Sequence, residues 1–405
     1  MDAFFQSPMS APSQVAATDA NALPQTDAEA QSLNLEYARL EDYEEFWRDH
    51  YHWLKDKGYQ LRPRYHPDWV HSWKGTKTKS YALWRFEDHH VAPHPLLMDA
   101  VHIRDQKVVM LRRPDPESLS DERKIGRPLS SESTISDTRN HCVPIYETLE
   151  LDTPDPDGWN LIVVMPCLVR WEIILEEFNS VGEVVDFCGQ IFEGLQFMHS
   201  LNVAHNDAKD TNIMMDWYPM FKDPPHPFHP YKNRDWSGNS KPRSRTLHPI
   251  KYYWIDYDMS KQYEPNSSPL QPSGYGGDQS VPEFRRNELC NPFKVDVYCA
   301  GNVIRTNFLA GIQHFVEPRD NLEFLNGLIS DMTHDDPLKR PSMDAVISRF
   351  TELCKGLHWW QLRSRVPPKN EHPLMRLFLT PTHWVKQVAY ILLRIPPVPD
   401  YRKRK

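Results

Sequence analysis

The chain has 405 residues, of which 40% are hydrophobic and 25% are charged, and its formal net charge is -8. Such a composition is typical of a globular protein that is long enough for two lobes or domains. With this net charge there is no global basic field that would indicate nucleic-acid binding, so no nucleic-acid partner is expected. There is no run of about 18 apolar residues, so no transmembrane segment is expected.

The cysteines and the N-terminus bear on the cellular compartment. The six cysteines form no CxxC pair and no metal-type cluster. The first residues contain no positively charged segment followed by an apolar segment, which is the pattern of a secretory signal. Both observations favour an intracellular, cytoplasmic protein with reduced thiols.

The chain begins with a polar tail and an aromatic-rich extension. Residues 1–35 are rich in Ala, Ser, Gln, Pro and Asp and cannot bury enough apolar surface to fold, so we expect a disordered tail. Residues 36–97 form an N-terminal extension, in which aromatic side chains predict one or two helices at residues 40–57. A pair of strands follows at residues 98–104 and 107–112, joined by a polar turn.

The next elements continue this mixture of helices and strands. Residues 118–129 predict a helix, and residues 143–149 and 161–165 predict two further strands. Met165 and Cys167 lie at the end of the second of these strands.

Residues 180–201 give the clearest helix in the sequence. Ser180 and Glu183 match a capping box, in which two side chains satisfy backbone N–H groups at the start of a helix. Apolar residues then recur at alternating steps of four and three, which gives one stripe that faces a core. The stripe comprises Val184, Cys188, Ile191, Leu195 and Met198.

The stretch that carries chemistry is residues 203–216, directly after this helix. It holds His205, Asp207, Lys209 and Asn212 in one short polar loop with apolar residues on both sides. Such flanks predict two short buried strands that fix the loop. Phosphoryl transfer needs these parts close together, because a carboxylate orients the attacking hydroxyl, a cation offsets charge on the phosphoryl group, and an amide oxygen helps to hold a metal ion.

A polar insert and a strand follow the loop. Residues 217–248 are rich in Pro and aromatic residues, and we expect an exposed excursion, either a loop of no fixed contact or a partner-binding segment. Residues 252–258 then predict an apolar strand that ends in an acid, with Asp256 as the candidate metal ligand.

The last part of the chain, residues 356–405, is a C-terminal extension. A short amphipathic helix is predicted at residues 384–393, packed on the folded body. The basic residues 402–405 fit a solvated tail, a nuclear address or a contact with anionic lipid.

The loop matches a known sequence pattern. The letters H-N-D-A-K-D-T-N at residues 205–212 resemble the catalytic loop of the protein kinase superfamily, H-R-D-L-K-x-x-N. Asn206 stands in place of the Arg and Ala208 in place of the Leu. Because that Arg usually receives a phosphate of the activation segment, no phosphate-ordered switch of the usual kind is expected.

Other marks of that superfamily follow in family order. Val-Pro-Glu ending at Glu283 resembles A-P-E, and the segment around Asp296 resembles the helix start D-x-W-x-x-G. The resemblance implies that Glu283 forms an ion pair with Arg340. It also implies that Asp296 hydrogen-bonds the backbone of the catalytic loop and holds it in shape.

The closest resemblance is to divergent protein-kinase-like proteins of filamentous and mushroom-forming fungi. The segments that carry it are residues 109–112, 139–145 and 191–199. It implies an α+β, two-lobed protein-kinase-like fold. The small β-rich N-lobe would cover residues 98–166, and the larger, mainly helical C-lobe would cover residues 167–355, with the insert at about 217–248.

The resemblance also assigns roles at the site, with ATP and Mg²⁺ as cofactors. Asp207 would accept or orient the proton of the substrate hydroxyl, and Lys209 would offset charge on the γ-phosphate. Asn212 and Asp256 would hold magnesium. The position of Lys209, two residues after Asp207, favours the serine/threonine class and a protein substrate.

Nucleotide binding is the part in which the sequence departs from the family. Arg112 stands at the position of the strand lysine that contacts the phosphates, and an Arg is not a conservative replacement. No G-x-G-x-x-G loop precedes that strand. In the family, those glycines let backbone N–H groups come close enough to the phosphates to bind them. Met165 and Cys167 lie at the hinge whose backbone would meet adenine, and the helix partner of Arg112 is either Glu122 or Lys124.

Three functions fit these observations. The first is an ATP-dependent protein serine/threonine kinase, which is supported by the complete set of Asp207, Lys209, Asn212 and Asp256. The second is a pseudokinase scaffold or binding module, which is favoured by the departures at the nucleotide site. The third is a small-molecule kinase of the choline or aminoglycoside type, which is suggested by the acid-rich strand end after Trp254.

Overall fold

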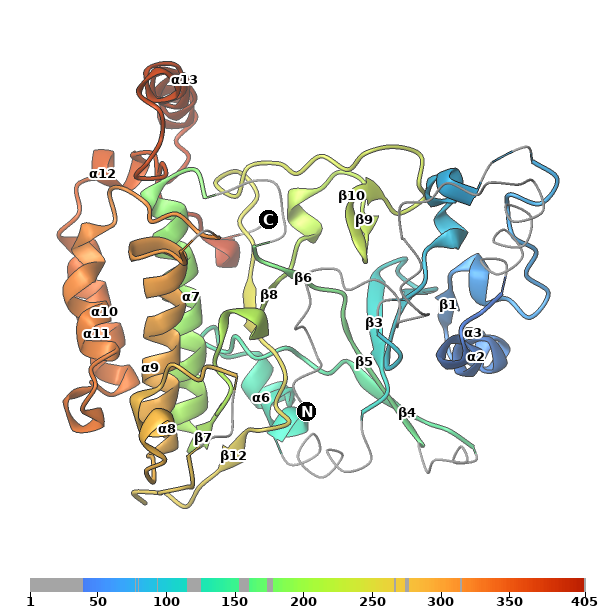
Figure 1. Cartoon of the computed structure of the whole chain (residues 1–405), viewed down its shortest axis with the longest axis horizontal. Coiled ribbons are helices and arrows are strands. Elements are labelled where there is room, and N and C mark those ends of the chain that lie inside the picture. The colour runs from blue at the N-terminus through green and yellow to red at the C-terminus, as the bar shows by residue number, and fades with distance from the viewer. Residues whose placement is uncertain are drawn as a thin grey trace. The chain divides into compact units, whose positions relative to one another are not determined.

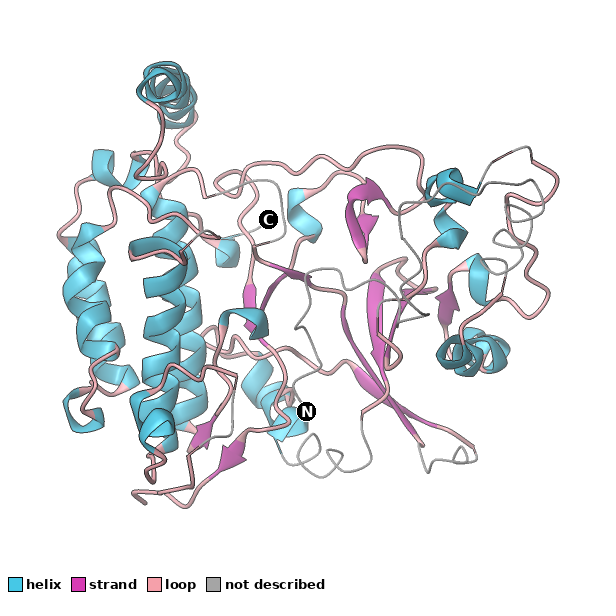
Figure 2. Cartoon of the chain, viewed as in Figure 1, coloured by secondary structure: helices cyan, strands magenta, loops and turns pink. Residues whose placement is uncertain are grey.

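The chain has a mixed α+β fold and divides into two compact units (Figure 2). The computed structural model describes residues 39–76, 78, 80–92, 94–114, 125–152, 160–172, 178–265, 267–273, 277–313 and 315–403. The predicted tail at residues 1–35 and both Glu122 and Lys124 lie outside the described residues. The first unit comprises Met1–Pro114, Tyr146–Cys167 and Asp223–Ser240, and the second comprises Asp115–Ile145, Leu168–Lys222 and Lys241–Lys405.

The first unit is built on a five-stranded sheet with the order β1-β2-β3-β5-β4, in which all neighbours are antiparallel (Figure 1). The strands are β1 (Tyr59–Leu61), β2 (Leu97–His102), β3 (Val108–Arg112), β4 (Glu147–Glu150) and β5 (Leu161–Pro166). The β2–β3 hairpin and β5 confirm three of the predicted strands. The strand predicted from residue 143 begins only at Glu147, because Val143 belongs to the second unit, where its N–H donates to the Trp254 carbonyl at 2.9 Å.

Two helices and three short 3-10 turns complete the main core of this unit. The helices α2 (Asp42–Asp49) and α3 (Tyr51–Asp56) confirm the helices predicted at residues 40–57. Their buried aromatic residues pack with the apolar face of the sheet, and this contact stabilises both elements. The core includes Trp47, Tyr51, Leu54, Met98, Leu111, Ile162 and Val164. The turns are η1 (Pro63–Tyr65), η2 (Ser80–Arg85) and η3 (Glu87–His89).

Buried charged side chains attach part of the insert to the first unit. Arg62 bridges Asp99 and Glu87, each at 2.9 Å. His226 and Arg234, both from the insert, contact the same two carboxylates, Glu87 and Asp99, each at 3.2 Å. Burial raises the pKa of Glu87, but the His226 hydrogen bond and the Arg62 charge outweigh it and lower this pKa to about 2.

The expectation of an exposed insert is therefore wrong for this segment. His226 is fully buried, and the segment forms a two-stranded ribbon of β9 (Pro225–His226) and β10 (His229–Asn233). The segments around the ribbon are also anchored, since Trp217, Met220 and Arg245 are buried within the second unit.

The second unit is organised around α7 (Val181–Ser200), which confirms the predicted central helix. The Ser180 hydroxyl accepts the Glu183 N–H as predicted. The Glu183 carboxylate, however, accepts the N–H of Asn179 at 2.7 Å and the N–H and hydroxyl of Thr246. Glu183 therefore fastens the end of the insert to α7 instead of closing the capping box.

The second unit contains further helices, among which α9, α11 and α12 pack against α7, and α7, α9 and α11 run side by side (Figure 1). The further helices are α5 (Arg127–Leu129), α6 (Glu132–Ile135), α8 (Pro282–Arg286), α9 (Pro292–Ile304), α10 (Asn326–Met332), α11 (Met343–Lys355), α12 (Trp359–Arg363) and α13 (Pro373–Leu392). The helix predicted at residues 384–393 is only the second half of α13. In the described part of the chain, no helix combines the length and apolar character that are needed to cross a bilayer.

Short strands frame the loop that follows α7. Strands β6 (Val169–Arg170), β8 (Ile213–Met215) and β11 (Tyr252–Trp254) form a three-stranded sheet in the order β11-β8-β6. Strand β7 (Val203–Ala204) pairs with β12 (Lys261–Gln262). β7 and β8 confirm the two buried strands predicted on either side of the loop. Gly194 lets α7 approach this sheet, because a Cβ there would lie 2.8 Å from the Trp254 ring.

The predicted ion pair between Glu283 and Arg340 is confirmed. Two guanidinium nitrogens of Arg340 donate to the two Glu283 carboxylate oxygens at 2.8 and 2.6 Å. Both side chains are almost fully buried, and the third nitrogen of Arg340 donates to the His334 carbonyl at 2.8 Å. A pair of this kind fixes α8 against the turn before α11, since neither charge can be left alone in the interior.

Replacing Arg340 tests how much the fold depends on this pair. Arg340→Leu leaves the Glu283 carboxylate buried without its partner, so the free energy of unfolding should fall by about 3–5 kcal/mol. Arg349→Leu is the matched control, because its pair with Asp331 is exposed, and it should change that free energy by less than about 1 kcal/mol. Urea unfolding measures both. Equal effects for the two variants would contradict a structural role for the buried pair.

Candidate active site

The backbone of the loop is held by one buried carboxylate. Asp296, on α9, accepts the N–H of His205 at 2.7 Å on one oxygen and the N–H of Asn206 at 2.8 Å on the other. The ring of His199, near the end of α7, donates to the same carboxylate at 3.0 Å. These contacts confirm the predicted role of Asp296. Asn206 adopts a left-handed backbone with φ of 64°, a conformation that Asn tolerates better than most residues.

His205 is a second anchor of the loop, and it is fully buried. Its Nε2 lies 3.1 Å from the Ile255 carbonyl, and its Nδ1 accepts the Asp207 N–H at 3.3 Å. The ring is therefore neutral, with the proton on Nε2. Burial lowers the pKa of His205, and this effect outweighs the opposing charges of Asp296 and Asp207.

Asp207 receives three hydrogen-bond donors. Its Oδ2 accepts from the Asn212 side-chain amide at 2.8 Å and lies 3.0 Å from the Lys209 ammonium. Its Oδ1 accepts the Gly277 N–H at 2.6 Å. The structure thus brings Asp207, Lys209 and Asn212 together as the sequence predicted. An ionised carboxylate in this setting can orient a hydroxyl donor, and the ammonium beside it can offset negative charge.

Asp256 is placed near Asn212 by the pairing of β8 with β11. Asn212 directly precedes β8, Asp256 follows β11 by two residues, and the strands are antiparallel, so both residues lie at the same end of the sheet. The Ile255 N–H donates to the Asn212 carbonyl at 3.0 Å, which closes the distance between the two segments. Asp256 has a left-handed backbone with φ of 68°.

The side chains at this end fit a magnesium ion that also binds phosphates. The Asn212 amide nitrogen donates hydrogen bonds to Asp207, so the amide oxygen remains as the atom that could bind a metal. An amide oxygen and the Asp256 carboxylate are the hard oxygen ligands that Mg²⁺ takes, and Mg²⁺ usually keeps waters or phosphate oxygens as its other ligands. Among the described residues there is no cluster of three or more His, Cys, Asp or Glu side chains suited to a metal.

The side chain of Asn206 joins the loop to the following segment. Its amide nitrogen donates to the Met259 carbonyl at 2.9 Å, and its amide oxygen accepts from the Gln271 side chain at 3.0 Å. Asn206 therefore forms a neutral link between two segments of the second unit. The absence of a phosphate-ordered switch stays a prediction.

The three predicted nucleotide-binding residues lie in the first unit. Arg112 ends β3 and is buried, with Val163 of β5 as its neighbour across the sheet. Met165 lies near the end of β5 opposite Met110, and Cys167 follows that strand and is buried. Arg112 and Met165 therefore belong to adjacent strands of one sheet, while the four loop and metal residues belong to the second unit.

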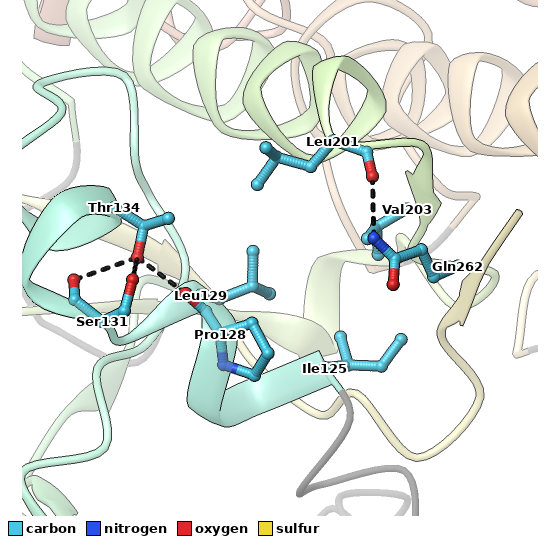
Figure 3. Close-up of a pocket in the computed structure, with 8 residues that line it drawn as sticks. All are labelled: Ile125, Pro128, Leu129, Ser131, Thr134, Leu201, Val203 and Gln262. Carbon is cyan, nitrogen blue, oxygen red and sulfur yellow. Dashed lines mark hydrogen bonds between the residues drawn. The ribbon is translucent and has the colours of Figure 1, made fainter. Parts of the chain in front are cut away.

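A pocket of 340 Å³ lies beside the loop, within the second unit (Figure 3). Its lining is mostly apolar and joins α5 and α6 to the end of α7, where Leu201 and Val203 precede His205. The lining residues are Ile125, Pro128, Leu129, Ser131, Thr134, Leu201, Val203 and Gln262. This pocket could not be predicted from local sequence patterns, because its walls come from segments far apart along the chain.

Two contacts of the site were also missed at the level of sequence. One is the Gly277 N–H on Asp207, and the other is the link from Gln271 to Asn206. The only available signal was the adjacent glycines at residues 276–277. A Cβ at Gly277 would lie 2.2 Å from the Lys209 ammonium, so a larger residue there would displace the end of the Lys209 side chain.

No model of a known protein family matches this chain, and no curated protein matches it.

Removing the acceptor that holds the loop should loosen it. Asp296→Asn replaces one accepting oxygen by an NH₂ group, so the N–H of either His205 or Asn206 loses its partner. Their amide hydrogens should exchange with deuterium about tenfold faster or more, because a hydrogen bond to a charged acceptor contributes about 1.5–3 kcal/mol. Asp344→Asn, at an exposed carboxylate, is the control and should leave the loop unchanged. Unchanged exchange in Asp296→Asn would contradict this role.

The neutral state of His205 predicts a pH dependence. Its pKa is lowered in the folded state, so its stabilising contribution is complete above the unfolded value of about 6.5 and is lost as the pH falls below it. The loss of unfolding free energy caused by His205→Gln should therefore be smaller at pH 5 than at pH 7. Urea unfolding at both pH values measures it, and an equal or larger loss at pH 5 would argue against a buried neutral ring.

Proposed function

We propose that the chain is an ATP-dependent protein serine/threonine kinase, which transfers the γ-phosphoryl group of Mg-ATP to a protein hydroxyl. One observation carries the proposal: an acid, a cation and an amide lie in hydrogen-bond contact in one loop, whose backbone is held by the buried carboxylate of Asp296. The fold in this proposal is a two-lobed protein-kinase-like fold. The sheet of the first unit would form the small lobe, and the helices around α7 would form the large lobe.

Asp207 is the residue that orients the attacking hydroxyl. Its Oδ1 accepts the backbone N–H of Gly277 at 2.6 Å, so this oxygen has the geometry to receive a hydrogen-bond donor. A serine or threonine hydroxyl would replace that donor and pass its proton toward Asp207 as the bond to phosphorus forms. Lys209, 3.0 Å from Asp207, would offset the charge on the transferred group.

Asn212 and Asp256 are the proposed magnesium ligands. Magnesium, when bound, supplies positive charge that neutralises the nucleotide phosphates. The protein contributes the fixed positions of the two oxygens at one end of the β8–β11 pair. Arg112 would contact the phosphates, and the backbone at Met165 and Cys167 would meet adenine.

A pseudokinase is the second candidate, and one observation favours it. The Asp207 carboxylate already accepts from Gly277, Asn212 and Lys209, which take three of its about four acceptor positions and leave little room for a substrate hydroxyl. Together with Arg112 at the lysine position, this arrangement suits a module that binds without transferring phosphate. Binding and turnover have to be measured separately to distinguish the two candidates.

Calorimetric titration with Mg-ATP tests the proposal on the intact chain. The wild type should bind, and Asp256→Asn should bind about tenfold more weakly or worse, because altering a metal site commonly lowers affinity by that factor. Asp344→Asn is the control and should bind as the wild type does. An absence of binding at millimolar nucleotide would refute the enzyme proposal, and equal binding by Asp256→Asn would refute the metal assignment.

A further inference from the structure

The C-terminal helix α13 is attached to the second unit through its polar side. His383, Gln387 and Tyr390 are buried, and their spacing of four and three places them on one face of the helix. The ring of His383 lies 2.8 Å from the Arg363 carbonyl, and the Arg363 guanidinium donates to Gln387 at 3.1 Å. Arg363 thus fixes which side of α13 faces the protein.

The opposite face of α13 is apolar and open to solvent. Its large side chains are between 50% and 77% exposed. At 3.6 residues per turn their positions fall on one side of the helix, about half a turn from the docked residues. We name this surface the α13 face: Leu374, Leu377, Phe378, Val385, Val388 and Leu392. The arrangement is the reverse of an ordinary surface helix, whose apolar side faces the core.

We propose that the α13 face binds to the surface of an anionic lipid bilayer. The surface is a contiguous series of large apolar side chains, which marks an interaction site and not an ordinary exposed surface. Because the other side of α13 is fastened to Arg363, the helix can enter a bilayer only sideways, in the plane of the headgroups. This inference is independent of the proposed kinase activity.

The charge around α13 selects an anionic surface. From residue 372 to residue 403 there are five basic side chains and one acidic side chain, a net charge of +4, in a chain whose total is -8. Asp400 contacts Arg402 and Lys403, and Arg402 also lies 3.5 Å from Glu193. Arg376 pairs with Asp320 at 2.6 Å, so Lys386 and Arg394 carry most of the positive charge that is available to lipid. The basic residues are Arg376, Lys386, Arg394, Arg402 and Lys403. Basic side chains beside an apolar helical face are the usual combination for binding to anionic lipid.

The neighbouring helix α12 strengthens the choice of a bilayer. Trp359 and Trp360 are both about half exposed, at 59% and 49%. Tryptophan is enriched at the boundary between headgroups and acyl chains, because its ring is apolar and its N–H stays hydrogen-bonded. The same unit thus presents an apolar helix, basic side chains and two open indole rings.

A second copy of the chain fits the α13 face less well. Paired helices usually carry opposite charges beside their apolar seam, and α13 contains Arg376 and Lys386 but no acid. Two such helices would bring like charges together. Pro381 also lies within the apolar face, where it removes a backbone N–H from the middle of the helix.

Sedimentation of the intact chain with lipid vesicles tests the inference. The wild type should sediment with vesicles of phosphatidylcholine and phosphatidylserine and not with vesicles of phosphatidylcholine alone, and added salt should weaken the binding. The double variant Phe378→Gln/Leu392→Gln should bind the anionic vesicles about tenfold more weakly or worse, since two large apolar side chains no longer enter the lipid. Lys386→Gln/Arg394→Gln should also weaken binding.

The matched control is Phe315→Gln/Leu338→Gln, because both side chains are more than 80% exposed but lie outside α13. It should bind as the wild type does, and thermal unfolding should show that all variants fold. Three results would overturn the inference: no sedimentation of the wild type with anionic vesicles, equal loss in the control, or binding unchanged in both α13 variants. A concentration-dependent dimer that the α13 substitutions abolish, without vesicle binding, would overturn it in favour of a second copy.

Discussion

The buried carboxylate of Asp296 is the constraint on which the candidate site depends. It accepts two consecutive backbone N–H groups, from His205 and Asn206, and thereby turns the chain sharply at the start of the loop. Asp207 follows directly and is aimed by that turn toward Asn212 and Lys209. A buried carboxylate or N–H group without a hydrogen-bond partner would lower the stability of the fold, so the turn and the acid stabilise each other. The positions of Asp207, Asn212 and Lys209 in the candidate site are thus set by a residue that has no proposed chemical role.

Elsewhere in the fold, too, buried charged side chains connect segments that are distant in sequence. Glu283 and Arg340 connect α8 to the turn before α11, and Glu183 connects α7 to the end of the insert. In the first unit, Arg62 contacts both Asp99 and Glu87. From the insert, His226 contacts Glu87 and Arg234 contacts Asp99. Each pair permits few alternative positions, since removing one partner leaves the other charge desolvated.

Some of this architecture could be predicted from the sequence. The strands of the β2–β3 hairpin, the long helix α7 and the loop from His205 to Asn212 follow from local patterns, and the partners of Asp296 and Glu283 follow from the order of motifs. The insert could not be predicted, because its burial depends on His226 and Arg234 meeting carboxylates more than a hundred residues away. The Gly277 contact and the length of α13 also escaped prediction. An apolar stripe normally predicts the side of a helix that faces the core, but in α13 the stripe is exposed and the polar side is docked.

The most direct test of the central claim is the rate of ADP formation from Mg-ATP by the intact chain, with dephosphorylated casein as acceptor. The comparison is between the wild type, Asp207→Asn and Asp210→Asn, which makes the same change in charge within the same loop. We expect turnover in the wild type and in Asp210→Asn, and a loss of about a hundredfold or more in Asp207→Asn, the usual contribution of a positioned acid–base group. A wild type that binds Mg-ATP but turns over no faster than Asp207→Asn would contradict the claim and identify a binding module.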